Sequence, residues 1–341
     1  MTYAVPSGWA RGFALGIGVG ALLLLFGACA AIEMQQVAAE PAVRRAAVPR
    51  ASGAASIASP RSEKAIPFID AHVHLNDVAM QLELMAANGI ARAVVFWGRA
   101  GDNASVQRAA RAHPDKFIAF ASVSPERSRY RSLWAQQDPQ LLVELDELLQ
   151  GGDFHGIGEI SIVHFPADGF AETDFSLASP LMRGIMDLAR RFSVPVMIHC
   201  EITRLNEVSS LLANYPDVRV IWAHGGYTPY FVARRMLEAH PNLLYELSAR
   251  TWRQHPRSPE YTIFKTDDDV WPEWLTLIET HPARFLVGTD ASHRSRAADQ
   301  MKIESVQRFL RQLSPSTQHA VAEGNLLRLV GGAEVARRRR P

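Results

Sequence analysis

The chain has 341 residues, of which 48% are hydrophobic and 21% are charged. This composition is typical of a globular protein and excludes a chain that is disordered throughout. The formal net charge of +1 gives no overall attraction for nucleic acid, and we expect no nucleic-acid partner. We interpret residues 333–341, which contain four consecutive arginines, as a basic tail.

The N-terminal segment, residues 1–32, is predicted to be an export signal. After Arg11 the stretch from Gly12 to Ile32 carries no charge and ends in small residues around Cys29. Three outcomes stay open: cleavage, lipidation of Cys29 as in a lipoprotein, or retention as a membrane anchor. We therefore expect an exported protein, either periplasmic or attached to a membrane through its N-terminus. Residues 33–66, rich in Ala, Pro, Ser and Arg without an apolar period, are expected to form a disordered linker.

Between residues 67 and 332, apolar strand-like runs alternate with amphipathic helical stretches, which is the pattern of βα units and a parallel sheet. Eight parallel strands in a domain of this length predict an α/β fold, a (β/α)8 TIM-type barrel, with an open doubly wound sheet as the alternative. No glycine-rich dinucleotide or phosphate loop follows any predicted strand. The predicted strands are Phe68 to His74, Ala91 to Trp97, Phe117 to Val123, Gly156 to Ile160, Pro195 to Cys200, Val218 to Ala223, Leu243 to Leu247 and Phe285 to Thr289.

Polar side chains end several of these strands, at the face of a barrel where functional groups gather. His72 and His74 alternate in the first strand, so both imidazoles are expected on the same side, where they can hold one metal ion. Two such histidines alone fit a solvated strand face equally well. Further imidazoles and carboxylates at other strand ends favour the metal site, because zinc and similar divalent ions prefer these ligands. These residues are Glu159, His199, His224 and Asp290.

The order H-x-H, Glu, His, His, Asp on successive strands resembles the amidohydrolase superfamily over nearly the whole domain. The segment from Glu323 to Leu329, with the sequence EGNLLRL, is similar to the closing G-N-x-x-R-L helix of the amidohydrolase-related branch. The resemblance implies a metal-dependent hydrolase that uses an activated water molecule on an amide, ester or lactone bond of a small molecule. Non-oxidative decarboxylation is the alternative, and a metal-dependent nuclease or a non-catalytic metal-binding barrel are further ones.

The resemblance also implies roles for individual residues. His72, His74 and Asp290 would bind metal, with His199 as a further ligand. Asp290 would in addition take a proton from the attacking water. His224 would either bind a second ion or polarise the substrate carbonyl.

The number of ions depends on Glu159, because a carboxylate at the fourth strand bridges two ions in some branches and not in others. One or two divalent ions are therefore expected, with zinc as the predicted metal and manganese as the alternative. Glu201 shares the face of His199, Arg250 follows the seventh strand and Trp97 ends the second. These three residues are weaker candidates for contact with substrate.

Overall fold

The computed structural model describes residues 64–99, 101–166, 171–253 and 261–338. The predicted export signal and almost all of the predicted linker lie outside these residues. Among the residues described, we find no helix that is both long and apolar enough to cross a membrane.

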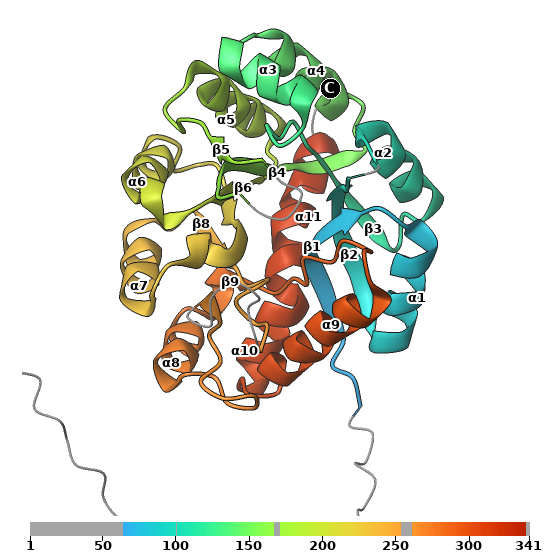
Figure 1. The fold of residues 1–341 in the computed structure, drawn as a ribbon, viewed down its shortest axis with the longest axis vertical. Helices are drawn as coiled ribbons and strands as arrows, with labels where there is room; N and C mark the ends of the chain where they lie inside the picture. The colour runs from blue at the N-terminus through green and yellow to red at the C-terminus, as the bar shows by residue number, and fades with distance from the viewer. Residues whose placement is uncertain (1–63, 100, 167–170, 254–260, 339–341) are drawn as a thin grey trace, which may run out of the picture. The chain divides into compact units, whose positions relative to one another are not determined.

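In this part of the chain nine strands form one sheet (Figure 1). Its order is β1-β2-β3-β4-β6-β7-β8-β9, with every neighbouring pair in that order parallel, and β5 pairs antiparallel with β4. The strands are β1 (Phe68–Leu75), β2 (Ile90–Trp97), β3 (Phe117–Ala121), β4 (Phe154–His164), β5 (Thr173–Asp174), β6 (Val196–Cys200), β7 (Val220–Trp222), β8 (Leu243–Glu246) and β9 (Phe285–Leu286).

Backbone hydrogen bonds join β1 to the segment that follows β9. The amide of Ala71 donates to the carbonyl of Val287 at 2.9 Å, and the amide of His74 donates to the carbonyl of Ala291 at 2.9 Å. The eight parallel strands therefore form a nearly closed barrel. The prediction of a TIM-type barrel is confirmed, and the open doubly wound sheet is excluded.

Helices surround the strands in Figure 1, one or two between most consecutive strands. Several have clear capping residues: the Ser179 hydroxyl oxygen accepts a hydrogen bond from the amide of Met182 at the start of α5, and His113, His240 and His281 are C-cap residues. The helices are α1 (Val78–Asn88), α2 (Asn103–Ala112), α3 (Ser128–Gln136), α4 (Gln140–Gln150), α5 (Pro180–Phe192), α6 (Leu205–Asn214), α7 (Tyr230–Ala239), α8 (Pro272–Thr280), α9 (Arg296–Leu310), α10 (Pro315–His319) and α11 (Asn325–Arg338).

A small apolar cluster fills the inside of the barrel, and α11 contributes to it. Leu326 and Val330 of α11 join this cluster, and Asn325 donates to the carbonyls of Pro282 and Phe285, each at 2.7 Å. Because Pro282 lies just before β9 and Phe285 begins it, α11 closes the barrel at the N-terminal ends of the strands. The helix continues to Arg338 and so includes residues 333–338 of the predicted tail. The strand residues of the cluster are Ile69, Ala71, Val94, Phe96, Ile118, Phe120, Met197, Ile221, Ala223, Leu244 and Leu286.

Side chains two positions further along a strand face the same side. His199 follows Met197 in this way, and Glu246 follows Leu244. The barrel interior is therefore apolar near the end that α11 closes and polar at the opposite end, where the strands finish.

Candidate metal centre

The two histidines of β1 have their Nδ1 atoms occupied by hydrogen-bond partners. His72 Nδ1 lies 3.2 Å from Glu246 Oε2, and His74 Nδ1 lies 3.3 Å from the carbonyl oxygen of Trp97. Both partners are acceptors, so each Nδ1 carries a proton, and each Nε2 would offer its lone pair to a metal ion when the ring is neutral. His72 Nε2 is buried and makes no hydrogen bond. Such an unsatisfied buried nitrogen is costly, and it fits a metal ligand.

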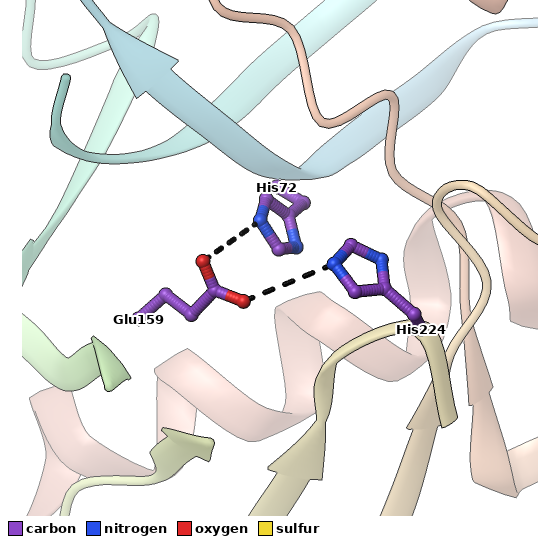
Figure 2. A group of neighbouring side chains, drawn as sticks. All are labelled: His72, Glu159 and His224. Carbon is purple, nitrogen blue, oxygen red and sulfur yellow. Dashed lines mark ion pairs between the residues drawn. The ribbon is translucent and has the colours of Figure 1, made fainter. Parts of the chain in front are cut away.

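Glu159 of β4 lies between two groups of histidines and is only 4% exposed. Its Oε2 atom is 3.4 Å from His72 Nε2 and 3.3 Å from His74 Nε2. Its Oε1 atom is 3.0 Å from His199 Nδ1 and 3.9 Å from His224 Nε2. Figure 2 shows the carboxylate directing one oxygen toward His72 and the other toward His224.

The position of Glu159 requires the glycine before it. Gly158 has a φ of +136°, and a Cβ atom there would lie 2.6 Å from the carbonyl oxygen of Met197 in β6. A side chain at this position would push β4 away from β6. Gly158 thus permits the close approach of strands that places Glu159 beside His199.

Asp290 approaches the histidines of β1 from the segment after β9. Its Oδ1 atom is 3.7 Å from His72 Nε2 and 3.4 Å from His74 Nε2. Its backbone is held in a left-handed conformation, with φ of 53°, by two hydrogen bonds. The amide donates to the carbonyl of His72 at 2.9 Å, and the carbonyl accepts from the Lys302 ammonium at 2.6 Å.

Four donor atoms thus converge: His72 Nε2, His74 Nε2, Glu159 Oε2 and Asp290 Oδ1. The distances from the two nitrogens to the two oxygens are between 3.3 and 3.7 Å. Ligands about 2.1 Å from a central ion at tetrahedral corners would be roughly 3.4 Å apart. These four nitrogen-to-oxygen distances fit ligands of one divalent ion, and the ligand atoms of His72, His74 and Asp290 all lie within 4.8 Å of one another.

A second set of donors surrounds the other oxygen of Glu159. His199 Nδ1 faces Glu159, and its Nε2 is 3.2 Å from Glu201 Oε1. His224 directs its Nδ1 toward the carbonyl oxygen of Ser248 at 3.0 Å, which leaves Nε2 directed toward Glu159. His72, Glu159 and His224 also form a group whose ligand atoms all lie within 4.8 Å of one another, as do His72, His74 and Asp290.

His224 begins a turn of four residues that all have a positive φ: His224, Gly225, Gly226 and Tyr227, with values between 53° and 57°. A Cβ atom on Gly225 would lie 1.7 Å from the Tyr245 ring, and one on Gly226 would lie 2.3 Å from the Trp222 ring. The two glycines after His224 are therefore required by space as well as by conformation. The turn places His224 Nε2 at 3.9 Å from Glu159 Oε1.

The basic groups around the two carboxylates of the centre stabilise their ionised forms. Burial raises the pKa of Glu159, but the neighbouring His72, His199 and His74 outweigh burial and hold it well below its usual range. Burial likewise opposes ionisation of Asp290, and His72, Lys302 and His74 lower its pKa. For His199 burial lowers the pKa, whereas hydrogen bonds to Glu159 and Glu201 raise it to about 10. The carboxylates of the centre are therefore ionised and surrounded by groups that stabilise their charge.

The model of the Amidohydrolase family matches residues 69–332 of the 341-residue chain. The chain belongs to this family. The resemblance predicted from the strand-end residues is thereby confirmed. None of the curated proteins compared with this amidohydrolase matches it.

Solved structures with the same fold come from several bacteria. An uncharacterised TIM-barrel protein of Bordetella bronchiseptica is 16% identical, with a TM-score of 0.59 over 79% of this chain and 100% of that chain. A 2,6-dihydroxybenzoate decarboxylase from Rhizobium is 14% identical, with a TM-score of 0.52 over 78% and 98%. A protein of Pseudomonas putida described as a 2-pyrone-4,6-dicarboxylic acid hydrolase is 15% identical, with a TM-score of 0.55 over 78% and 98%. At these identities the likeness supports the fold alone.

The structure brings together all six residues predicted as metal ligands, together with Glu201. Trp97 adjoins the centre through its carbonyl oxygen, while its indole nitrogen donates to Glu126 Oε1 at 3.3 Å. Arg250 is buried elsewhere: its Nη1 donates to the Thr228 carbonyl at 3.0 Å and to the Tyr245 hydroxyl at 3.1 Å. In this structure Arg250 therefore supports the loop after β7. Contact of Glu201, Trp97 or Arg250 with a substrate stays a prediction.

Sequence reasoning missed other residues at the centre. Glu246 ends β8 and is fully buried against His72 and His224. The sequence does indicate Glu246 as a candidate, because a glutamate inside the apolar run from Leu243 to Leu247 is unusual for a buried strand. Tyr227 was also missed, and its ring stacks on the His224 imidazole with a centroid distance of 5.2 Å. The positive φ that places this ring has no clear signal in the sequence.

Proposed function

We propose that this amidohydrolase is a metal-dependent hydrolase that cleaves an amide, ester or lactone bond of a small molecule. The convergence of His72 Nε2, His74 Nε2, Glu159 Oε2 and Asp290 Oδ1 carries the proposal. Exposure supports the direction of attack, because the Asp290 side chain is 24% exposed, whereas those of His72 and Glu159 are 0% and 4% exposed. Asp290 thus lies on the open side of the donor set, where substrate and water arrive.

The donor set also bears on the number of ions. His72, His74 and Asp290 would hold one divalent ion, and His199 and His224 would hold a second, with Glu159 contributing one oxygen to each group. Zinc is the proposed metal and manganese the alternative, because imidazole and carboxylate ligands suit both. A bound divalent ion would supply Lewis acidity, polarising the bond under attack and lowering the pKa of a water molecule toward neutrality.

Asp290 is the proposed general base. Its carboxylate is ionised, and its backbone is fixed by His72 and Lys302, so the side chain has a defined position. In the proposed reaction Asp290 takes one proton from water as the water oxygen bonds to the carbonyl carbon. The bond from that carbon to nitrogen or oxygen then breaks, and the leaving group receives the proton.

The structure favours His224 as a ligand over His224 as a hydrogen-bond donor to the substrate. Its Nδ1 lies 3.0 Å from the carbonyl oxygen of Ser248, which only accepts, and 2.9 Å from the Ser248 hydroxyl oxygen, whose own proton goes to Glu246 Oε2. The ring proton is therefore placed on Nδ1. Nε2, on the side of Glu159, then carries a lone pair and has no proton to donate.

The proposal is tested on the purified chain after loading with zinc or manganese. We expect hydrolysis of at least one member of a panel of amides, esters and lactones, and loss of that activity after chelation. Release of carbon dioxide from aromatic carboxylic acids, without hydrolysis of any panel member, would instead establish decarboxylation. Hydrolysis that continues in the fully metal-free protein would contradict the proposal.

We also propose that the protein is exported and reaches its substrate outside the cytoplasm. The uncharged segment from Gly12 to Ile32 supports export. The mass of the mature protein, measured after cell fractionation, distinguishes cleavage, lipidation of Cys29 and retention. Recovery of the full-length chain in the soluble cytoplasmic fraction would contradict export.

A further inference from the structure

Glu246 is a buried carboxylate that the proposed mechanism does not use. It ends β8, is fully buried and accepts four hydrogen bonds. Its Oε2 atom is 3.2 Å from His72 Nδ1, 3.2 Å from the backbone amide of His224 and 2.7 Å from the Ser248 hydroxyl. Its Oε1 atom accepts the amide of Ser248 at 2.6 Å. One carboxylate therefore joins ligands from two different parts of the chain.

The two ligand contacts act in different ways. At His72 the carboxylate accepts a hydrogen bond from Nδ1–H. This bond fixes the tautomer of the ring and directs Nε2 toward Asp290 and Glu159. At His224 the carboxylate accepts a hydrogen bond from the backbone amide. This bond restrains the first residue of the turn from His224 to Tyr227, whose residues all have a positive φ. Loss of the carboxylate would leave both histidines less restrained at once.

Packing holds Glu246 in this position. A Cβ atom on Gly288 would lie 2.6 Å from Glu246 Oε1 and 2.8 Å from His72 Cβ, so the backbone of the last strand segment closes over the carboxylate. Ser248 binds both oxygens of the carboxylate. The group is therefore rigid and well placed to transmit its position to its partners.

We infer that Glu246 is a positioning residue that aligns His72 in one half of the centre and His224 in the other, so that uptake of both ions depends on it. The inference rests on the two-ion centre proposed above. It distinguishes Glu246 from a ligand such as His74, whose loss affects only its own ion. A carboxylate that orients a ligating histidine typically contributes about 10- to 100-fold in metal affinity.

The test measures Zn²⁺ affinity and stoichiometry by competition with a chromophoric chelator, using the full chain stripped of metal. Glu246→Gln is compared with the wild type, with His74→Ala and with Glu279→Gln. Glu279 is a matched control because it also accepts several hydrogen bonds, from Ser314 and Thr317, but belongs to α8. We expect Glu246→Gln to weaken both binding steps by about 10- to 100-fold, His74→Ala to weaken one step, and Glu279→Gln to leave both unchanged.

Contrary outcomes are separable. Wild-type affinities in Glu246→Gln, or weakening of a single step, would overturn the inference, as would uptake of only one ion by the wild type. If the wild type binds no ion, the proposed function itself fails. If the melting temperature of metal-free Glu246→Gln shows that it does not fold, Glu246→Asp decides, since it keeps the charge and withdraws the carboxylate from His72 Nδ1 and from the His224 amide. Smaller losses at both steps in Glu246→Asp support the inference, and unchanged binding overturns it.

Discussion

Asp290 combines two properties that set it apart from the buried ligands. It belongs to the donor set, with Oδ1 at 3.4 Å from His74 Nε2, and its side chain is also partly open to solvent, at 24% exposure. The side chains of His72, Glu159, His199 and His224, by contrast, are at most 5% exposed. This difference between residues of the same centre gives separate expectations for their removal.

Replacement of Asp290 by asparagine removes the proton acceptor and keeps the size of the side chain. We expect kcat for a hydrolysed panel substrate to fall by about 10²- to 10⁴-fold, the range that general base catalysis contributes. Metal content, measured by elemental analysis of the same samples, should fall much less than activity. Asp290→Asn with wild-type kcat would show that another group accepts the proton.

Replacement of His72 by alanine removes the most central ligand, whose Nε2 atom neighbours both Glu159 and Asp290. We expect metal content to drop below one ion per chain in elemental analysis after dialysis. His113→Ala is the control, because His113 caps α2 far along the chain from the ligands. Equal metal content in His72→Ala and wild type would exclude the proposed ligand set.

At the scale of elements, the number and order of the strands could be predicted from the sequence more accurately than the residues at which each strand ends. The eight apolar runs correspond to β1, β2, β3, β4, β6, β7, β8 and β9, because burial on both faces makes parallel strands continuously apolar. β5 was not predicted, since two residues, Thr173–Asp174, carry no periodic signal. β4 extends to His164, beyond the predicted end at Ile160, because β5 pairs with its last residues.

The site was predictable to the extent that strand ends determine it. The six predicted ligands follow from polar residues at the ends of apolar runs, whereas the direction of Arg250 depends on the loop after β8 and could not be read from spacing. The turn from His224 to Tyr227 is a similar case, because its shape depends on contact with Tyr245 from another strand. Long-range packing of this kind has no local signature.

This turn gives a prediction for Gly225. Alanine there would place its Cβ atom 1.7 Å from the Tyr245 ring, which is held by hydrogen bonds to Thr228 and Arg250. We expect Gly225→Ala to lower the free energy of unfolding by about 3 kcal/mol or more, from strain in the backbone and overpacking together. Denaturant titration of the variant and the wild type measures this change in the free energy of unfolding.

Gly152→Ala is the matched control for Gly225→Ala. Gly152 also has a positive φ, of +81°, but a Cβ atom there meets nothing within 4 Å. Only the conformational penalty of about 1 kcal/mol is expected. Equal losses in the two variants would show that contact with Tyr245 is unimportant.

At the scale of the whole molecule, α11 completes the barrel from the C-terminal end of the sequence. Leu326 packs inside the barrel and is 2% exposed, whereas its neighbour Leu327 is 41% exposed. We expect Leu326→Ala to lower the free energy of unfolding by about 2 to 5 kcal/mol, as large-to-small changes in cores do. Leu327→Ala, measured in the same denaturant titration, should change it by less than about 0.5 kcal/mol. Similar values for both would mean that α11 does not close the interior.

The closure of the barrel also sets an order of events during synthesis. The first strand pairs with the segment that includes Ala291, and His72 finds its carboxylate partner 174 positions further along the chain. A nascent chain that has emerged only as far as β8 has one edge of its sheet unpaired, lacks Asp290 and lacks the helix that fills the interior. Contacts so distant in sequence slow folding, because the chain between them must first be ordered. A chain that has left the ribosome or an export channel only as far as β8 therefore has no complete donor set with which to compete for the proposed metal.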